Sequence, residues 1–432
     1  MSHLVPSSSF DFARVLLPGD RVMWPQGTGE PTGLSSALIK QLPELGRLTL
    51  VTGMLTSLTL ESIARENVDF LCLNGAGGGR KPAAWSHNRI IPAHISAIPA
   101  LISEKRIPVD VALVRARPTR DSAVWSLGVM VDFVHELVGA ARVVIAELDE
   151  RLPLTSDDAL IQRARFTHVT EADGAEPMLL NLRPSATDLA VARRVAQLIP
   201  DRATLQLGVG GLPTAVCEAL TAHKDLGLHS GVIPDAVVPL LESGVISNRY
   251  KGVDVGRTVT GGLFGTRRLF DHANGNDRIA MRRATYTHAA RTHAMINGLY
   301  SINSAIELDL TGQCNAEVAG RSYVGAVGGQ VDFVRGARLS AGGRAVMALG
   351  SATEDGVHSK IVASLGNRPV TTPRSDIDLV VTEYGVADLW GLDLNARAEA
   401  LIAIAHPRFR DSLSHQLEEQ RRQNSSENFW RF

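Results

Sequence analysis

The sequence has few cysteines and almost no net charge. Its 432 residues include three cysteines, Cys72, Cys217 and Cys314, which lie far apart and lack the short spacing of metal-binding cysteines. This pattern argues against a disulfide framework or a cysteine zinc site and favours a reducing compartment. The formal net charge of -1 provides no overall field to attract nucleic acid or an anionic membrane. We therefore expect no metal and no nucleic-acid partner.

Long apolar runs and short repeats are also missing. No stretch approaches the ~20 apolar residues that span a bilayer, and the first residues lack a basic region followed by an apolar run. The absence of a short-period repeat excludes solenoids and propellers. We expect a cytoplasmic protein that has no membrane partner.

Apolar runs of strand length alternate with amphipathic stretches of helical length. The expected strands are residues 47–54, 68–74, 109–116 and 141–148, and then residues 203–209, 226–230, 344–350 and 378–385. The expected helices are residues 34–45, 95–105, 130–140, 187–199, 215–220 and 395–406. This alternation predicts an α/β protein in which helices connect parallel strands.

The length of the chain predicts two domains, residues 1–183 and 184–432, because 432 residues exceed the usual size of one core. Pro184 disfavours helix at the join. The helix expected next has a capping residue available in Ser185 or Thr187.

Two glycine-rich turns stand between an expected strand and an expected helix. Residues 207–213 read LGVGGLP, and residues 27–31 read GTGEP. Such turns let backbone N–H groups face an anion, although they are also common structural punctuation. The turn at residues 207–213 lacks the GxGxxG spacing and the later acidic residue of a dinucleotide site, so we expect no NAD. A phosphate or pantetheine tail remains compatible with it.

A third glycine pair, Gly328 and Gly329, precedes what reads as a strand edge. Consecutive N–H groups there can stabilise an oxyanion, although a tight turn explains the pair equally well.

Titratable side chains near turns or strand ends form a further set of candidates, most of which we expect to be structural: His229, Asp235, Glu242, His288, Glu307, Asp309, Asp332, Glu383 and Asp388. A serine hydrolase is disfavoured, because there is no GxSxG motif and the adjacent His229 and Ser230 point to opposite faces of a strand.

Several ordered segments are together far more specific than any one turn. They read PGDRV, GTGEP, LQLGVGGLP, DLGLHS, NSAIELDLTGQCNAE, VGGQVDFVRGA, TTPRSDIDLVVTEYGVADLWG and ALIAIAHPRFRD. On these segments the whole chain resembles the acetyl-CoA hydrolase / 4-hydroxybutyrate CoA-transferase family, of the class I CoA-transferase type. The resemblance implies two related open α/β domains with parallel-rich sheets and an active site between them. It also implies acyl-CoA and a small carboxylic acid as substrates, and a homo-oligomer.

The resemblance further implies a covalent mechanism. A glutamate attacks the thioester, and an acyl-glutamyl anhydride and a glutamyl-CoA thioester form before an acceptor carboxylate takes CoA. Dividing the exchange in this way lowers each barrier, as does an oxyanion hole of backbone N–H groups. By motif, the residues facing CoA are Gly208, Val209, Gly210, Gly211, Leu212, Gly328 and Gly329. The last two also form the oxyanion hole, and Glu383 is a supporting carboxylate of the active site.

The chain departs from the family's pattern at Gly231. The family's nucleophile follows the serine of LGxHSE, whereas this chain reads LGLHSG, so Gly231 occupies the catalytic position. A second departure is His288, at a place where related enzymes can carry an asparagine. Transfer of CoA is the first assignment. Two alternatives stay open: hydrolysis by water in the room left by the missing side chain, with Glu383 or His288 as base, and acyl-CoA binding without turnover.

Overall fold

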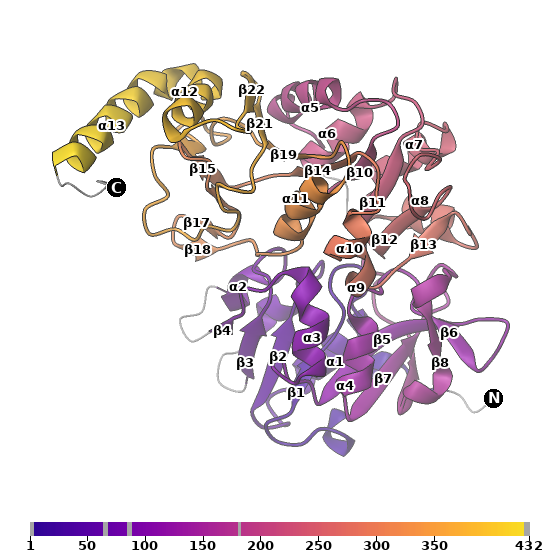
Figure 1. Cartoon of the computed structure of the whole chain (residues 1–432). Helices are drawn as coiled ribbons and strands as arrows, with labels where there is room; N and C mark the ends of the chain where they lie inside the picture. The colour runs from indigo at the N-terminus through magenta and orange to yellow at the C-terminus, as the bar shows by residue number, and fades with distance from the viewer. Residues whose placement is uncertain (1–3, 64–67, 84–88, 180–182, 427–432) are drawn as a thin grey trace.

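Two lobes, each organised around a mostly parallel sheet, make up the computed structural model, which describes residues 4–63, 68–83, 89–179 and 183–426 (Figure 1). The parallel strands of the first sheet run in the order β4-β3-β2-β1-β5-β7-β9, and β6 and β8 extend it by antiparallel pairing. The strands are β1 Arg21–Met23, β2 Leu48–Thr52, β3 Val68–Cys72, β4 Arg89–Ile90, β5 Val111–Pro118, β6 Val124–Ser126, β7 Val143–Leu148, β8 Leu160–Gln162 and β9 His168–Glu171.

Short helices connect the strands of the first lobe. They are α1 Thr32–Gln41, α2 Arg80–Ala83, α3 Ile98–Ser103 and α4 Val134–Ala140, with the 3-10 turns η1 Ser7–Ser9, η2 Phe12–Arg14, η3 Thr59–Ser62, η5 Ile95–Ala97, η6 Asp157–Ala159 and η7 Arg163–Arg165. Helices α3 and α4 pack against each other, and α3 lies on the side of the first lobe that faces the second lobe (Figure 1).

The second sheet has the order β13-β12-β11-β10-β14-β19-β21-β22 and is parallel except for its last strand. Its strands are β10 Thr204–Gln206, β11 Gly227–Ile233, β12 Thr258–Leu263, β13 Ile279–Met281, β14 Leu299–Asn303, β19 Arg344–Ala348, β21 Leu379–Thr382 and β22 Gly385–Asp388. Two small sheets contain β15 Glu307–Asp309, β16 Cys314–Asn315 and β20 Ile361–Val362, and β17 Val318–Ala319 and β18 Ser322–Tyr323.

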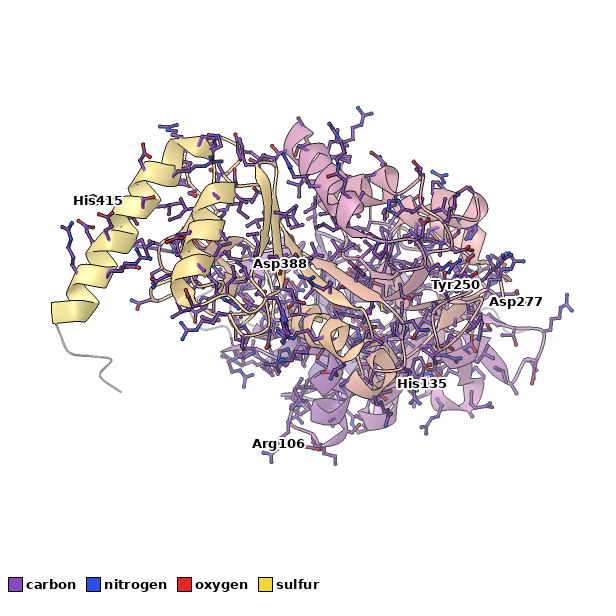
Figure 2. The ribbon with its side chains drawn as sticks, turned by 45° about the horizontal axis from the view of Figure 1, so that its top comes forward. Arg106, His135, Tyr250, Asp277, Asp388 and His415 are labelled. Atoms are coloured by element: carbon purple, nitrogen blue, oxygen red, sulfur yellow. The ribbon has the colours of Figure 1, made fainter. Side chains whose placement is uncertain are left out.

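The second lobe contains the longest helices together with several short ones. They are α5 Ala186–Leu198, α6 Gly211–Ala219, α7 Val238–Glu242, α8 Arg267–Ala273, α9 Ala284–Thr287, α10 Ala290–His293, α11 Gln330–Leu339, α12 Leu394–Ile404 and α13 Pro407–Ser426, with the 3-10 turn η8 Asp235–Val237. Helix α13 extends away from the sheets as an arm that carries His415 (Figure 1, Figure 2).

The central strands of both sheets are largely buried, which explains why the sequence predicted several of them. Strand β5 is buried over its first six residues, and β19 is buried at four of its five. Such strands read as continuous apolar runs. Strand β12 is buried at every residue but contains two threonines and two glycines, and it was not predicted. One hydrophobic cluster spans the two lobes, because it includes Met23 and Val114 from the first sheet and Leu205 and Val346 from the second. The α/β class, the expected strands and the expected helices are confirmed, whereas the boundary at residues 183 and 184 stays a prediction.

The start of α5 is the helix cap that the sequence suggested. The Ser185 side chain accepts a hydrogen bond from the Asp188 N–H, and the Asp188 carboxylate accepts one from the Ser185 N–H. This reciprocal capping box satisfies donors that the first helical turn leaves unpaired.

The strand expected after Gly329 is wrong, because residues 330–339 form helix α11. The segment QVDFVRGARL reads as alternating at its start. Over its full length, however, the buried residues Val331, Val334 and Ala337 recur at helical spacing. The glycine pair therefore lies at the N-terminus of a helix and not at a strand edge.

Within the described residues, none of the helices is both long and apolar enough to cross a membrane.

Candidate active site

A cavity of about 200 Å³ lies between the lobes, at the carboxyl ends of strands from both sheets. Its lining comprises Gln26, Met54, Asn74, Ile95, Asp132, Gln206, Leu207, Gly208, Val209, Gly231, Val232, Phe264, His288, Asn303, Gly328, Gly329, Gln330 and Phe333. Gln26, Met54 and Asn74 follow β1, β2 and β3, and Gln206 and Asn303 end β10 and β14. In open α/β sheets, this edge is where ligands bind.

The cavity brings together six of the residues that the sequence singled out: Gly208, Val209, Gly231, His288, Gly328 and Gly329. The others lie outside its lining. Gly210, Gly211 and Leu212 form the start of α6, next to the turn that lines the cavity. Glu383 follows β21, where its two carboxylate oxygens accept hydrogen bonds from the Ser351 N–H at 2.9 Å and the Ser351 Oγ at 2.6 Å. Its catalytic role stays a prediction.

The imidazole of His288 fills the space into which a side chain at position 231 would project. A Cβ atom built on Gly231 would lie 2.7 Å from both Cε1 and Nε2 of His288. A Cβ atom built on Gly329 would lie 2.5 Å from the same Nε2. The ring therefore lies between two glycines and requires both. The expectation that the missing side chain leaves room for water is wrong, because the His288 ring occupies the space where the Cβ of residue 231 would lie.

His288 follows α9 and is fixed by contacts on other sides. Its Nδ1 lies 2.8 Å from the Thr287 Oγ1, and its ring meets the Phe333 ring edge to face with centroids 4.9 Å apart. Burial lowers the pKa of His288 to about 3, so the imidazole is neutral near neutral pH. A neutral imidazole offers Nε2 either as a donor or as a lone pair, depending on the tautomer.

The sequence analysis did not single out Asp132, which is buried and lines the cavity. Its Oδ2 accepts a hydrogen bond from Gln26 Nε2 at 2.8 Å, and its Oδ1 accepts one from the Phe133 N–H at 2.6 Å. Burial raises the pKa of Asp132 to about 7 despite these hydrogen bonds. A single acidic residue inside the apolar run VMVDFV was the signal that could have identified it.

Amides supply most of the remaining polarity of the cavity. Asn303 Nδ2 donates to Gln206 Oε1 at 2.9 Å, and Gln206 Nε2 lies 3.3 Å from Asn303 Oδ1. Among the described residues that line the cavity, Asp132 carries the only carboxyl group. The site therefore combines backbone and amide hydrogen-bonding groups with one carboxyl and one neutral imidazole.

The other titratable candidates have structural contacts outside the cavity. Three of them accept hydrogen bonds: Asp235 from Thr266, Asp309 from Thr311 and Gln313, and Asp332 from Ser96. Three others lie beside basic side chains: Glu242 near Arg268 and His272, Glu307 paired with Arg368, and Asp388 paired with Arg344. His229 is buried with its Nε2 3.1 Å from the Thr287 carbonyl oxygen, and Ser230 Oγ donates to the Leu207 carbonyl at 2.8 Å. The predicted absence of a serine–histidine pair agrees with these contacts.

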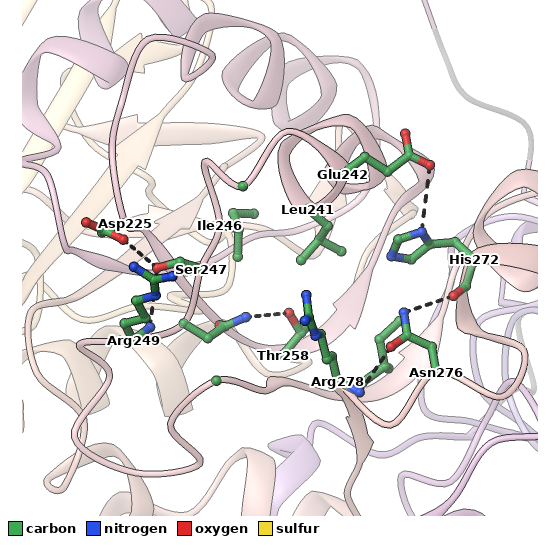
Figure 3. Close-up of a pocket in the computed structure, with 14 residues that line it drawn as sticks. Asp225, Leu241, Glu242, Ile246, Ser247, Arg249, Thr258, His272, Asn276 and Arg278 are labelled. Carbon is green, nitrogen blue, oxygen red and sulfur yellow. Dashed lines mark hydrogen bonds and ion pairs between the residues drawn. The ribbon is translucent and has the colours of Figure 1, made fainter.

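A larger cavity, of about 570 Å³, opens at the amino ends of β11, β12 and β13 (Figure 3). Its polar groups are largely paired with one another. Ser247 Oγ donates to Asp225 Oδ1 at 2.8 Å, and Asn248 Nδ2 donates to Thr258 Oγ1 at 3.0 Å. It lies at the opposite strand ends from the Gly231 cavity, and it offers no buried polar group that is left without a partner among its described residues.

Comparison with known proteins identifies the family. Residues 265–417 match the model of the acetyl-CoA hydrolase/transferase C-terminal domain. The chain is 38% identical over 403 residues to 4-hydroxybutyrate coenzyme A transferase of Clostridium kluyveri, an alignment that covers 91% of this chain and 92% of the relative. The chain belongs to the acetyl-CoA hydrolase/transferase family.

Solved structures of this family have the same fold. The 4-hydroxybutyrate CoA-transferase of Porphyromonas gingivalis is 32% identical with a TM-score of 0.80, and the comparison covers 97% of this chain and 98% of the other. RipA of Yersinia pestis is 28% identical with a TM-score of 0.88, covering 95% and 96%. The predicted membership of the acetyl-CoA hydrolase/transferase family, the fold and an enzymatic function are thus confirmed.

Proposed function

We propose that the cavity between the lobes binds the thioester end of an acyl-CoA and that the enzyme transfers CoA to a small carboxylic acid. The observation that carries this proposal is the convergence of two glycine segments, Gly208–Val209 and Gly328–Gly329, on one cavity. Extended similarity to a relative named as a CoA transferase supports transfer as the reaction.

The glycine segments present unpaired donors. Within the described residues, the N–H groups of Val209 and Gly329 donate to no protein acceptor, whereas Gly328 forms a backbone bridge with His94 of the first lobe. Gly329 is also the N-cap of the ten-residue helix α11, whose first N–H groups lack partners within the helix. These groups stabilise negative charge on the thioester oxygen as a tetrahedral intermediate forms. Gly328 has a φ of 60°, a conformation that favours glycine.

The start of α6 supplies the path for the rest of CoA. Gly210 has a φ of 120°, and a Cβ atom built on it would meet no atom within 4 Å. The backbone of Gly210 is therefore approachable from solvent next to the cavity, whereas a Cβ atom built on Gly211 would lie 3.0 Å from Asp188 Oδ2 and Leu212 is buried. Glu383 acts in this proposal by holding the Ser351 turn after β19 and not by direct contact with the thioester.

A homo-oligomer in a reducing cytoplasm is the proposed setting. The three cysteines are free and buried, which suits a reducing compartment. Large apolar side chains are exposed in one short segment at the sheet edge, namely Tyr384, Val386, Trp390, Leu392 and Leu394. Exposed apolar groups clustered in this way are typical of an interface between subunits. Light scattering at several protein concentrations measures the subunit number.

Hydrolysis is the second candidate function, because position 231 provides no carboxylate and the carboxyl group of Asp132 is placed to activate a water molecule. The two functions differ in their need for an acceptor. Purified protein is mixed with acetyl-, butyryl- or succinyl-CoA, with and without a second carboxylic acid, and the CoA species are separated by mass spectrometry.

Formation of the acceptor's CoA thioester, dependent on the acceptor, is the expected result. Free CoA released at the same rate without acceptor would instead establish hydrolysis. Binding of acyl-CoA with neither product would show that the protein only binds its ligand.

A further inference from the structure

We infer that Asp132 is the carboxylate that attacks the thioester, so that the first lobe provides the nucleophile that position 231 of the second lobe lacks. This inference rests on the proposed CoA transfer. It gives a specific residue the covalent role for which Gly231 has no side chain.

Backbone pairing places Asp132 beside Gly231. Residues 129–132 run antiparallel to the carboxyl end of β12, because the Val131 N–H donates to the Gly261 carbonyl at 2.9 Å and Met130 bridges to Gly262. Gly261 lies next to Gly231 in the sheet, since the pairs on either side of them are in register. A Cβ atom built on Gly261 would lie 3.0 Å from the Gly231 carbonyl oxygen and 3.7 Å from the Asp132 Cβ.

The backbone of Asp132 is also joined to the segment that carries His288. The Ala284 N–H, at the start of α9, donates to the Asp132 carbonyl oxygen at 2.7 Å. One residue of the first lobe thus touches both β12 and α9 of the second. These two contacts hold the residue at the cavity, which is what a reacting group requires.

The electrostatic surroundings favour a reactive carboxylate. Among the described residues, no lysine or arginine forms an ion pair with Asp132. The Gln26 amide and the Phe133 N–H each contact one carboxylate oxygen, so both oxygens keep a lone pair for reaction. Burial, together with the nearby charge of Glu136, opposes ionisation and raises the pKa. A poorly solvated carboxylate is a stronger nucleophile than one stabilised by a cation.

The reaction then proceeds in balanced steps without proton transfer. An Asp132 oxygen attacks the thioester carbon, the C–S bond breaks, and CoA leaves as the thiolate to give an acyl-aspartyl anhydride. The thiolate attacks the Asp132 carbonyl carbon, which releases the first carboxylic acid as its anion and leaves an aspartyl-CoA thioester. The acceptor carboxylate attacks that thioester and expels the thiolate, which attacks the acceptor's acyl carbon. The new acyl-CoA forms and Asp132 returns as the carboxylate.

Trapping tests the nucleophile directly. Wild-type protein is incubated with acyl-CoA without acceptor and treated with borohydride, which reduces an enzyme–CoA thioester to an alcohol. Peptide mass spectrometry locates the change, which we expect at Asp132. Reduction at any other residue, or no reduction in protein that transfers CoA, would overturn the inference.

Substitution provides a second test with a matched control. Asp132→Asn should bind CoA as the wild type does but transfer it at least ~1,000-fold more slowly, as for other enzymes that lose their nucleophile. Asp378→Asn is the control, because Asp378 is also a buried aspartate with a pKa raised by burial but lies outside the cavity. We expect the control to retain more than half of the wild-type rate. An Asp132→Asn protein within tenfold of that rate would also overturn the inference.

The outcomes separate this inference from the proposed function. Wild-type protein that hydrolyses acyl-CoA without transfer contradicts transfer, and the trapping experiment still decides the role of Asp132. Wild-type protein that does neither contradicts both. Thermal unfolding of each variant shows whether a lost activity reflects a lost fold.

Discussion

Gly231→Ala is the substitution that tests the packing of the active site most directly. Gly231 lies inside β11, and its φ is outside the left-handed region, so the backbone accepts alanine. The added Cβ would lie 2.7 Å from two atoms of the His288 ring, whereas ordinary contacts begin near 3.4 Å. The ring must therefore move by about 0.7 Å in a closely packed site. On its other side Gly329 approaches it, and Thr287 and Phe333 hold it in place.

Overpacking of this kind costs about 1–3 kcal/mol of folding free energy. For a domain of this size the apparent melting temperature should fall by about 2–10 °C. Four proteins are compared by thermal unfolding: the wild type, Gly231→Ala, His288→Ala and the double variant. His288→Ala alone removes the packing contacts of the ring. In the double variant, the removed ring leaves room for the alanine at position 231.

The double-mutant cycle should therefore show a favourable coupling of about 1 kcal/mol or more between the two substitutions. The double variant is expected to be more stable than the sum of the single effects predicts. A Gly231→Ala protein as stable as the wild type, or strictly additive effects, would refute the conclusion that the imidazole occupies this space.

Three further predictions concern the same cavity. Gly329→Ala should slow CoA transfer by at least ~10-fold with a smaller change in CoA binding. The added Cβ would meet the His288 Nε2 at 2.5 Å and displace the oxyanion donors. Steady-state kinetics measures the rate of transfer, and titration with CoA measures binding. In the unfolded chain His288 binds a proton below pH 6.5, its ordinary pKa. In the folded chain the lowered pKa keeps the imidazole unprotonated until the pH falls to about 3. Stability is thus lost as the pH falls through this range, and denaturation curves of His288→Asn should lose less of it. The raised pKa of Asp132 has the opposite sign: the folded protein holds a proton between 3.8 and about 7 that the unfolded chain has lost, so stability falls as the pH rises through that range. Asp132→Asn should therefore gain melting temperature relative to the wild type between pH 4 and 7, and a constant difference across that range would contradict the assignment.

Features determined by nearby residues were readable from the sequence. Buried strands such as β5 and β19 appeared as apolar runs, whereas the glycine-containing β12 did not. The cap at Ser185 depends on Asp188, three residues away. Helix α11 was misread because its first residues alternate in the manner of a strand, although its full length has helical periodicity.

The catalytic geometry depends on contacts between distant residues, and local patterns do not encode it. Asp132 enters the cavity because its segment pairs with β12, more than a hundred residues later in the chain. The position of Gly231 was readable by its motif, but the ring that covers it comes from His288, beyond two further strands. Sequence reasoning could therefore locate the site, most of its glycines and His288, but not the packing of the imidazole between Gly231 and Gly329 or the presence of Asp132 in the cavity.

The two departures from the family's pattern, at positions 231 and 288, are one structural exchange. With His288 in its observed place, a glutamate at position 231 would begin with a Cβ that overlaps the ring, so the glycine and the histidine depend on each other. Restoring Gly231→Glu alone therefore introduces a carboxylate that cannot reach the thioester without displacing the imidazole. Because the ring fills that space, a carboxylate for covalent chemistry has to approach from another element. Asp132 does so from the first lobe, against the strand that neighbours β11.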